Sequence, residues 1–194
     1  MVKKNFPETI NIISCEQPPL ILHSQAVKKF EKIYDQYENL VCILWNDTKL
    51  KALVEICVSQ INGCGFCVDI HSMEARAVGE SQQRLDSLLV WDKSPFFSDL
   101  ERAALEWAES VTLCSETGVP DEVYKKVRKF FSINKLVGLT YLIINMNGLN
   151  RIAVSFRMTA STRTEWNIWS VLLYHHIWLM NFDTSWTIWI TWRY

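Results

Sequence analysis

The stretch "LVEICVSQINGCGFCVDIHSMEARAVGE", residues 53–80, decides the fold. Its first part repeats apolar residues at helical spacing, with Leu53, Val54, Cys57, Val58 and Ile61 on one face. Asn62–Gly63 interrupts the pattern, because both residue types tolerate the left-handed conformation that ends helices. A second helix is predicted from about Cys64 to Val78, with Gly79 ending it. The stretch therefore predicts two consecutive helices, with a CxxC in the first turn of the second.

Helical patterns continue on both sides of this pair. Before it, residues 24–41 repeat apolar residues with helical spacing, and Asp47 or Thr48 is the expected cap of the helix that contains Leu53. After it, helices are predicted at 81–91, 98–114, 120–131 and 134–158, the second of these with a Ser98–Glu101 capping box. No strand alternation appears before residue 160. We predict an all-α fold: a single compact domain, residues 1–159, of about six to seven helices.

The apolar segment 134–158 is long enough to cross a bilayer. Polar residues interrupt it at Asn145, Asn147, Asn150 and Arg151. We therefore predict a central core helix rather than a membrane span.

Composition and charge argue against some partners and some cellular compartments for this protein. The 194 residues carry a net charge of -1, so a broad basic surface is absent and nucleic acid is not an expected partner. The N-terminal residues contain no apolar run typical of a secretory signal. The six cysteines show no framework spacing apart from one close pair, which favours a reducing compartment, and we expect a cytoplasmic protein. Cys42, Cys57 and Cys114 lie in apolar surroundings and are predicted to be buried.

Residues 160–194 differ in character, because six of the nine tryptophans lie there. Three interpretations stay open for this atypical tail: a packing or oligomerisation element, a membrane-interface segment, or sequence foreign to the domain, such as a shifted reading frame. No function is assigned to it.

The CxxC and a following histidine carry the chemistry. On a helix, Cys64, Cys67 and His71 have i, i+3 and i+7 spacing and lie on one face. The two thiols are close enough for a disulfide, and the helix N-terminus stabilises a thiolate. His71 can accept the proton of Cys67 or form an ion pair with its thiolate.

Two other interpretations of these residues remain. A structural zinc site normally needs four ligands, and the sequence has no second CxxC; His175 and His176 are adjacent, without helical ligand spacing. Two thiols and a histidine could also be incidental in a core helix. We favour redox chemistry, which needs no metal and no other cofactor.

Residues 53–80 resemble the core motif of the alkyl hydroperoxidase D-like (AhpD-like) proteins of the carboxymuconolactone decarboxylase superfamily, and the similarity extends over about residues 20–157. The resemblance implies an all-helical domain, assembly into trimers or larger homo-oligomers, and thiol-dependent peroxide reduction. The decarboxylating members do not depend on the dithiol, so its presence favours the redox branch.

By the same resemblance, Cys67 corresponds to the peroxide-attacking cysteine, Cys64 to its disulfide partner, and His71 to the proton-relay histidine. The relay glutamate of the family falls on Ala52, which is a departure from the pattern. Glu55 lies three residues later and is a tentative substitute. The implied partners are a peroxide and an external dithiol donor. A redox-sensing or interaction protein with little turnover, a decarboxylase-like enzyme, and a non-catalytic helical scaffold are the alternatives.

Overall fold

The computed structural model describes residues 47–160, and every regular element in that range is a helix. The elements are α2 (Thr48–Asn62), α3 (Gly65–Ala77), α4 (Gln82–Ser87), the 3-10 helix η2 (Leu88–Val90), α5 (Asp99–Thr112), α6 (Cys114–Thr117), α7 (Asp121–Val127) and α8 (Ile133–Ser155). The predicted all-α class is confirmed. The predicted helix at 24–41 and residues 161–194 of the tail lie outside the described range.

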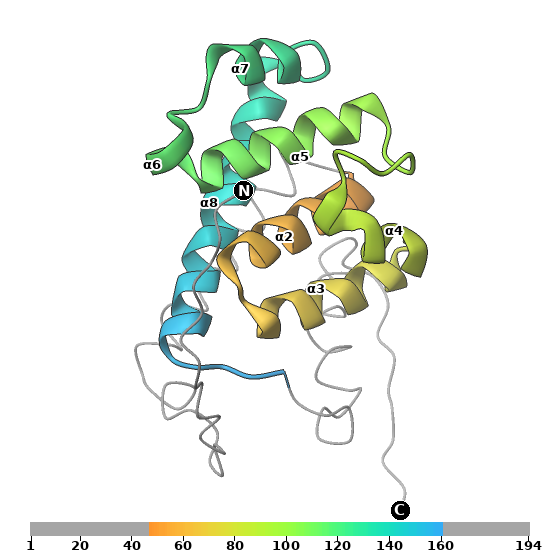
Figure 1. The fold of residues 1–194 in the computed structure, drawn as a ribbon, viewed down its shortest axis with the longest axis vertical. Coiled ribbons are helices and arrows are strands. Elements are labelled where there is room, and N and C mark those ends of the chain that lie inside the picture. Colours follow the sequence, from red (N-terminus) through yellow and green to blue (C-terminus); the bar gives the residue numbers. More distant parts are fainter. Residues whose placement is uncertain (1–46, 161–194) are drawn as a thin grey trace, which may run out of the picture. The chain divides into compact units, whose positions relative to one another are not determined.

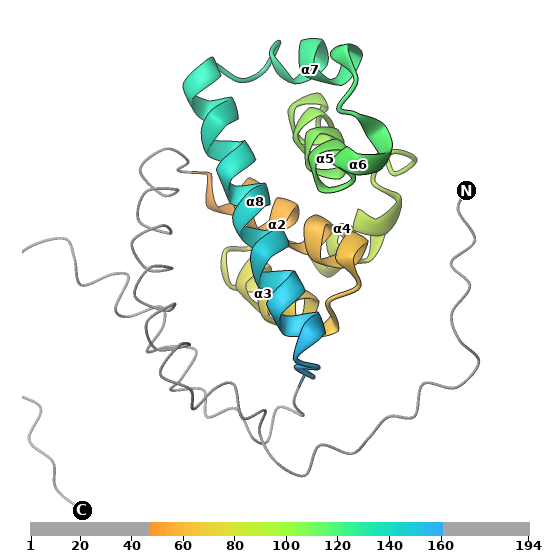
Figure 2. The same cartoon turned by 90° about the vertical axis from the view of Figure 1, so that its left-hand side faces the viewer.

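Helix α2 is the centre of the described domain. It packs against α3, α5 and α8, with α5 and α3 on opposite sides of it in Figure 1. Helix α8 is the longest of the described helices, and in Figure 2 it crosses in front of α2 and α3. This arrangement places the α2–α3 turn, which precedes the CxxC, beside the second half of α8.

Local signals at the helix ends are those that the sequence predicts. Asp47 caps α2, with its carboxylate accepting from the amide of Leu50 at 3.0 Å. Gly63 ends α2 in the left-handed conformation, at a φ of 69°. Ser98 and Glu101 form the predicted capping box at the start of α5. The turn at Gly63 fixes where α3 begins, and therefore where the two cysteines lie.

The apolar core surrounds α2 on two sides. One cluster joins α2 to α5, α7 and α8, and its largest fully buried members include Leu139, Leu142, Ile143 and Met146 of α8. A second cluster joins α2 to α3, α4, η2 and α5 through Ile56, Ala75, Leu85, Leu88 and Leu105. Among residues 47–160 the structure contains no helix with the length and hydropathy of a membrane span. The buried residues of α8 in the first cluster make it the core helix that the sequence predicts.

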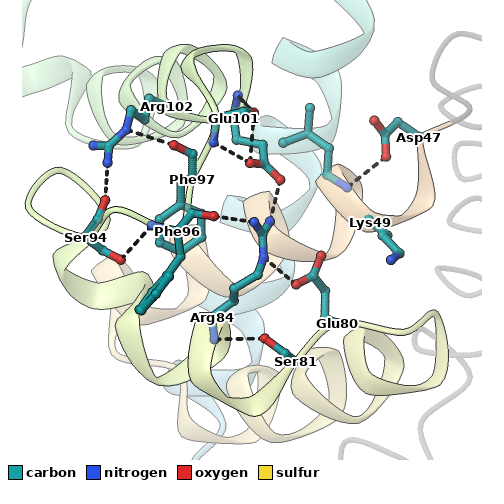
Figure 3. A network of polar contacts seen from close by, with 12 residues as sticks. Asp47, Lys49, Glu80, Ser81, Arg84, Ser94, Phe96, Phe97, Glu101 and Arg102 are labelled. Atoms are coloured by element: carbon teal, nitrogen blue, oxygen red, sulfur yellow. Dashed lines mark hydrogen bonds and ion pairs between the residues drawn. The ribbon is translucent and has the colours of Figure 1, made fainter.

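Two arginines hold the irregular segment between η2 and α5 (Figure 3). Arg84 of α4 donates to Glu80, Glu101 and the carbonyl of Phe96, and its guanidinium lies 5.0 Å from the centre of the Phe97 ring. Arg102 of α5 donates to backbone carbonyls of the same segment, those of Trp91, Asp92, Ser94 and Phe97. Five carbonyl groups of this irregular segment thereby have a hydrogen-bond partner.

The structure separates two cysteines for which the sequence predicts the same environment. Cys57 is buried in α2, as predicted, and burial, together with the charge of Glu109, raises its pKa to about 12. Cys114 is exposed, so its predicted burial is wrong. The reason is that α5 ends at Thr112, and Cys114 begins the separate short helix α6. Cys42 lies outside the described residues.

Candidate functional site

Cys64 and Cys67 form a disulfide at the N-terminus of α3. Their Cα atoms lie 5.4 Å apart, within the range that disulfides require. Cys64 is also the N-cap residue of α3, and its Sγ accepts from the amide of Cys67 at 3.3 Å. Sγ of Cys64 therefore lies at the N-terminus of α3, where the helix dipole and free amide groups favour negative charge.

Both cysteines are nearly inaccessible, with 2% of Cys64 and 5% of Cys67 exposed. They form a small apolar cluster with Ala153 of α8, and the partly buried Phe66 and Met158 pack against this cluster. The last turns of α8 thus cover the dithiol, although α3 and α8 are far apart in the sequence.

His71 follows Cys67 by one turn of α3 and contacts two carboxylates. Its Nδ1 lies 2.8 Å from Oε2 of Glu74 and 3.6 Å from Oε2 of Glu55. The first distance is that of a hydrogen bond, whereas the second is a charge contact without one. Glu55 comes from α2 and Glu74 from α3, so the ring is held from two helices.

Lys51 balances part of this negative charge. Its Nζ lies 2.8 Å from Oε1 of Glu55, one turn later on α2. The Glu55 side chain is only 2% exposed, so this ion pair is well shielded from water. Ala52, on which the sequence resemblance places a relay glutamate, is buried in the core and has no proton to exchange.

The carboxylates change the acidity of the histidine. Burial lowers the pKa of His71, but Glu55 and the hydrogen bond to Glu74 together outweigh burial and the charge of Lys51, so its pKa is raised. A raised pKa keeps a larger fraction of the imidazole protonated at neutral pH. The site thus favours an imidazolium, which can hold a thiolate as an ion pair and donate a proton.

Among the described residues, Glu55, His71 and Glu74 form a group that could bind a metal ion. The candidate ligand atoms of Glu55, His71 and Glu74 lie within 4.8 Å of one another. The ammonium group of Lys51, 2.8 Å from Glu55, already neutralises one of these carboxylates. We therefore interpret the group as a proton-exchange cluster rather than a metal centre.

A buried polar network lies beside the dithiol turn and was not predicted from the sequence. Asn150 of α8 is completely buried; its amide donates to Oγ of Ser59 at 3.1 Å, and its Oδ1 accepts from Asn62 at 3.0 Å. Asn62 also donates to Asn147 at 3.1 Å. These bonds join the end of α2 to α8 directly before Cys64. Asparagines that interrupt an apolar helix are the signal that could have indicated such a network.

The described region has hollows in its surface. One, of about 360 Å³, is mostly apolar and lies between α5, α7 and α8, with Trp107, Tyr124, Val137 and Tyr141 among its lining residues. Another, of about 200 Å³, is lined by Asn62, Asn150, Arg151, Val154 and Ser155. Neither is lined by the cysteines or by His71, which agrees with the burial of the disulfide.

Comparison with known proteins places this geometry in a family. The chain is 40% identical over 113 residues to the uncharacterised protein YdfG of Bacillus subtilis, a match that covers 58% of this chain and 77% of YdfG. It is 36% identical over 110 residues to the uncharacterised protein YnjA of Escherichia coli, covering 57% of this chain and 58% of YnjA.

Solved structures show the same fold. A protein of unknown function from Agrobacterium tumefaciens, for which a role in antioxidant defence as AhpD has been suggested, matches with a TM-score of 0.71 and 36% identity over 75% of this chain and 100% of its own. The debrominase Bmp8 matches with a TM-score of 0.53 and 19% identity over 59% of this chain and 61% of its own, a likeness of fold alone.

A family match agrees with these likenesses. Residues 30–110, which include the α2–α3 pair and the CxxC, match the carboxymuconolactone decarboxylase family. Together with the 40% identity to YdfG over 77% of that protein, this match means that the chain belongs to the carboxymuconolactone decarboxylase family.

Proposed function

We propose that the protein is a thiol-dependent peroxidase that reduces hydrogen peroxide or alkyl hydroperoxides through a cycle of Cys64 and Cys67. The observation that carries the proposal is the Cys64–Cys67 disulfide at the start of α3, followed by a histidine held between two carboxylates. A dithiol, a proton donor and a means of holding that donor are the groups that such a reaction needs.

In the oxidative half, the thiolate of Cys67 attacks the terminal peroxide oxygen and the O–O bond breaks. Cys67 becomes a sulfenic acid, and the leaving alkoxide or hydroxide takes a proton from the imidazolium of His71. The thiol of Cys64 then displaces the sulfenic hydroxyl group, which gives the disulfide and water. The peroxide is reduced by two electrons, and the dithiol is oxidised by two.

In the reductive half, an external dithiol donor reduces the disulfide by thiol–disulfide exchange through Cys64. The donor becomes a disulfide, while Cys64 returns to a thiol and Cys67 to a thiolate. The proton that His71 lost in the oxidative half must be returned before the next cycle. These steps use only the chain's own side chains, a peroxide and a dithiol.

The raised pKa of His71 supports its role as the acid of this scheme. Glu55 supports the role from α2, because its carboxylate faces Nδ1 at 3.6 Å.

We further propose a homo-oligomer, a trimer or hexamer, which light scattering after size-exclusion chromatography tests directly.

A redox sensor with little turnover is the second candidate. The burial of both cysteines favours it, because substrate must displace Phe66, Met158 or their neighbours to reach the sulfurs. A sensor would form the disulfide once with peroxide but would show no sustained peroxide consumption in the presence of dithiothreitol.

Peroxide consumption with dithiothreitol should be compared in the wild type, Cys67→Ser, Cys64→Ser and Cys114→Ser. We expect the two site variants to lose turnover and Cys114→Ser, an exposed cysteine outside the site, to retain it. Mass spectrometry after one equivalent of peroxide should find a sulfenic acid on Cys67 when Cys64 is serine. Undiminished turnover in Cys67→Ser would end the proposal.

A further inference from the structure

The end of α8 brings a side chain that belongs to no helix onto the disulfide cluster. That cluster consists of Cys64, Cys67 and Ala153, and Phe66 and Met158 pack against it. Phe66 belongs to α3 and Ala153 to α8, so helical hydrogen bonds hold their backbones in place. Met158 lies beyond the end of α8. Its backbone is therefore the part of this cover that can move while both helices stay intact.

Two hydrogen bonds fold the chain back after α8 and set the position of Met158. The amide of Met158 donates to the carbonyl of Ala153 at 2.9 Å, and the amide of Arg157 donates to the carbonyl of Val154 at 3.1 Å. This pair of bonds is the Schellman arrangement, in which the residue after the left-handed position commonly contacts an apolar residue one turn earlier. Here these two residues are Met158 and Ala153, and the turn brings Met158 against the cluster that contains the cysteines.

The turn that holds Met158 contains an unfavourable residue. Arg157 occupies the left-handed position with a φ of 57°, where glycine is the usual residue and a Cβ atom costs free energy. The turn therefore opens more readily with arginine at this position than it would with glycine. The cover over the disulfide is thus held by two hydrogen bonds and a strained residue rather than by a helix.

We propose that Met158 is a gate over the disulfide, and that the turn at Arg157 opens before an external dithiol reaches Sγ of Cys64. The inference rests on the proposed thiol-dependent function and adds the residue that controls access to the dithiol. Cys64 is 2% exposed and Cys67 5%, so the closed turn leaves almost no sulfur surface for an attacking thiolate. Met158 takes no part in the chemistry, and its effect is on access alone.

The chemistry behind the gate shows why it must open. A thiolate of the donor attacks Sγ of Cys64, the Cys64–Cys67 bond breaks, and Cys67 leaves as a thiolate. The second sulfur of the donor then displaces Cys64 from the mixed disulfide. The donor becomes a disulfide and loses two electrons to the chain; of its two protons, one ends on Cys64 and the other passes to water. In the mixed disulfide a donor sulfur is bonded to Cys64, so the side chains packed on Cys64 have to make room for it.

Three substitutions in the full-length chain test the gate. Met158→Ala removes most of the covering side chain but keeps the turn. Arg157→Gly keeps Met158 and places glycine at the left-handed position, so the closed turn becomes more stable. Val154→Ala shortens a side chain of the same turn that is 49% exposed, and it is the matched control. Thermal unfolding of each oxidised variant establishes that the fold is intact.

Reduction of the disulfide by dithiothreitol and its formation by oxidised dithiothreitol should both be timed, by acid quench, alkylation and mass spectrometry. We expect Met158→Ala to accelerate both directions by roughly tenfold, the effect of removing a half-buried methionine from an apolar contact. Arg157→Gly should slow both by roughly fivefold, because the strain of the left-handed residue is relieved. Val154→Ala should behave as the wild type. A gate alters the barrier and not the states that it separates, so the equilibrium with dithiothreitol should be the same in all four proteins.

An unchanged rate of reduction in Met158→Ala would overturn the inference. So would acceleration of reduction alone, because the equilibrium would then have moved and Met158 would act by stabilising the disulfide. Reduction of Arg157→Gly at the wild-type rate would show that the turn does not have to open. These measurements use no peroxide. Failure of the proposed peroxidase function, seen as undiminished peroxide consumption in Cys67→Ser, is therefore a separate result.

Discussion

Oε2 of Glu55 lies 3.6 Å from Nδ1 of His71, although the two residues belong to different helices. The contact exists because α2 and α3 pack against each other after the turn at Gly63, which brings the middle of α2 opposite the middle of α3. The site thus has a carboxylate facing its histidine, although the sequence resemblance places the relay glutamate at Ala52.

Replacing Glu55 with glutamine should weaken the proposed acid. The substitution keeps the size of the side chain but removes a negative charge that raises the pKa of His71, so that pKa should fall. We expect the alkaline limb of the pH–rate profile to move to lower pH. Activity above neutrality should fall by roughly tenfold for each pKa unit lost. Glu116→Gln serves as the control, and an unmoved alkaline limb in Glu55→Gln would show that Glu55 does not act on the ring.

The stability of the protein should depend on pH through His71. Its pKa in the folded state is raised above the unfolded value of about 6.5. Protonation of His71 therefore stabilises the fold fully below that unfolded value, and this contribution is lost as the pH rises through the folded pKa. We expect the free energy of unfolding of the wild type to approach that of His71→Asn over that window. Urea unfolding of the oxidised proteins at a series of pH values measures it, and a constant difference would contradict the shift.

Alkylation should distinguish Cys57 from Cys114. Burial raises the pKa of Cys57 to about 12, so almost no thiolate forms at pH 8, whereas Cys114 is exposed. Iodoacetamide should modify Cys114 within minutes and leave Cys57 intact until the protein is unfolded. Peptide mapping by mass spectrometry checks both sites. Rapid labelling of Cys57 in folded protein would mean that α2 opens locally.

The network around Asn150 should stabilise the packing of α8 on α2. Asn150→Ala leaves Ser59 and Asn62 without their bonds to it, and we expect a loss of about 1–3 kcal/mol in the free energy of unfolding. A double-mutant cycle with Ser59→Ala should show a coupling of about 0.5–3 kcal/mol. The exposed Ser115→Ala should be nearly neutral. Additive losses in the cycle would mean that the hydrogen bond contributes little.

The helices could be predicted from the sequence because their signals are local. Asp47, the Ser98–Glu101 pair and Gly63 each act through the nearest turn of backbone, so the pattern of residue types suffices. Cys114 was misjudged because apolar neighbours indicate burial only while a helix continues, and α5 ends two residues earlier.

The candidate site could be predicted only in part. Cys64, Cys67 and His71 belong to one helix and its N-cap, so their spacing alone predicts that they lie close together. Glu74 was missed, although its i, i+3 spacing from His71 on that helix could have indicated it. The bonds of Asn150 to α2 join residues far apart in the chain, and no local pattern contains that information.

Cys64 has two roles in one atom, because its sulfur is both half of the disulfide and the acceptor that caps α3. Reduction changes that acceptor from a disulfide sulfur to a thiol or thiolate, so the redox couple and the helix–coil equilibrium of α3 are thermodynamically linked. A substitution on the outer face of α3 that stabilises the helix more in the reduced protein therefore raises the midpoint potential of the pair. One that stabilises the helix more in the oxidised protein lowers it. Helix propensity, at positions that never meet the sulfurs, is thereby a means of adjusting the redox potential of the pair.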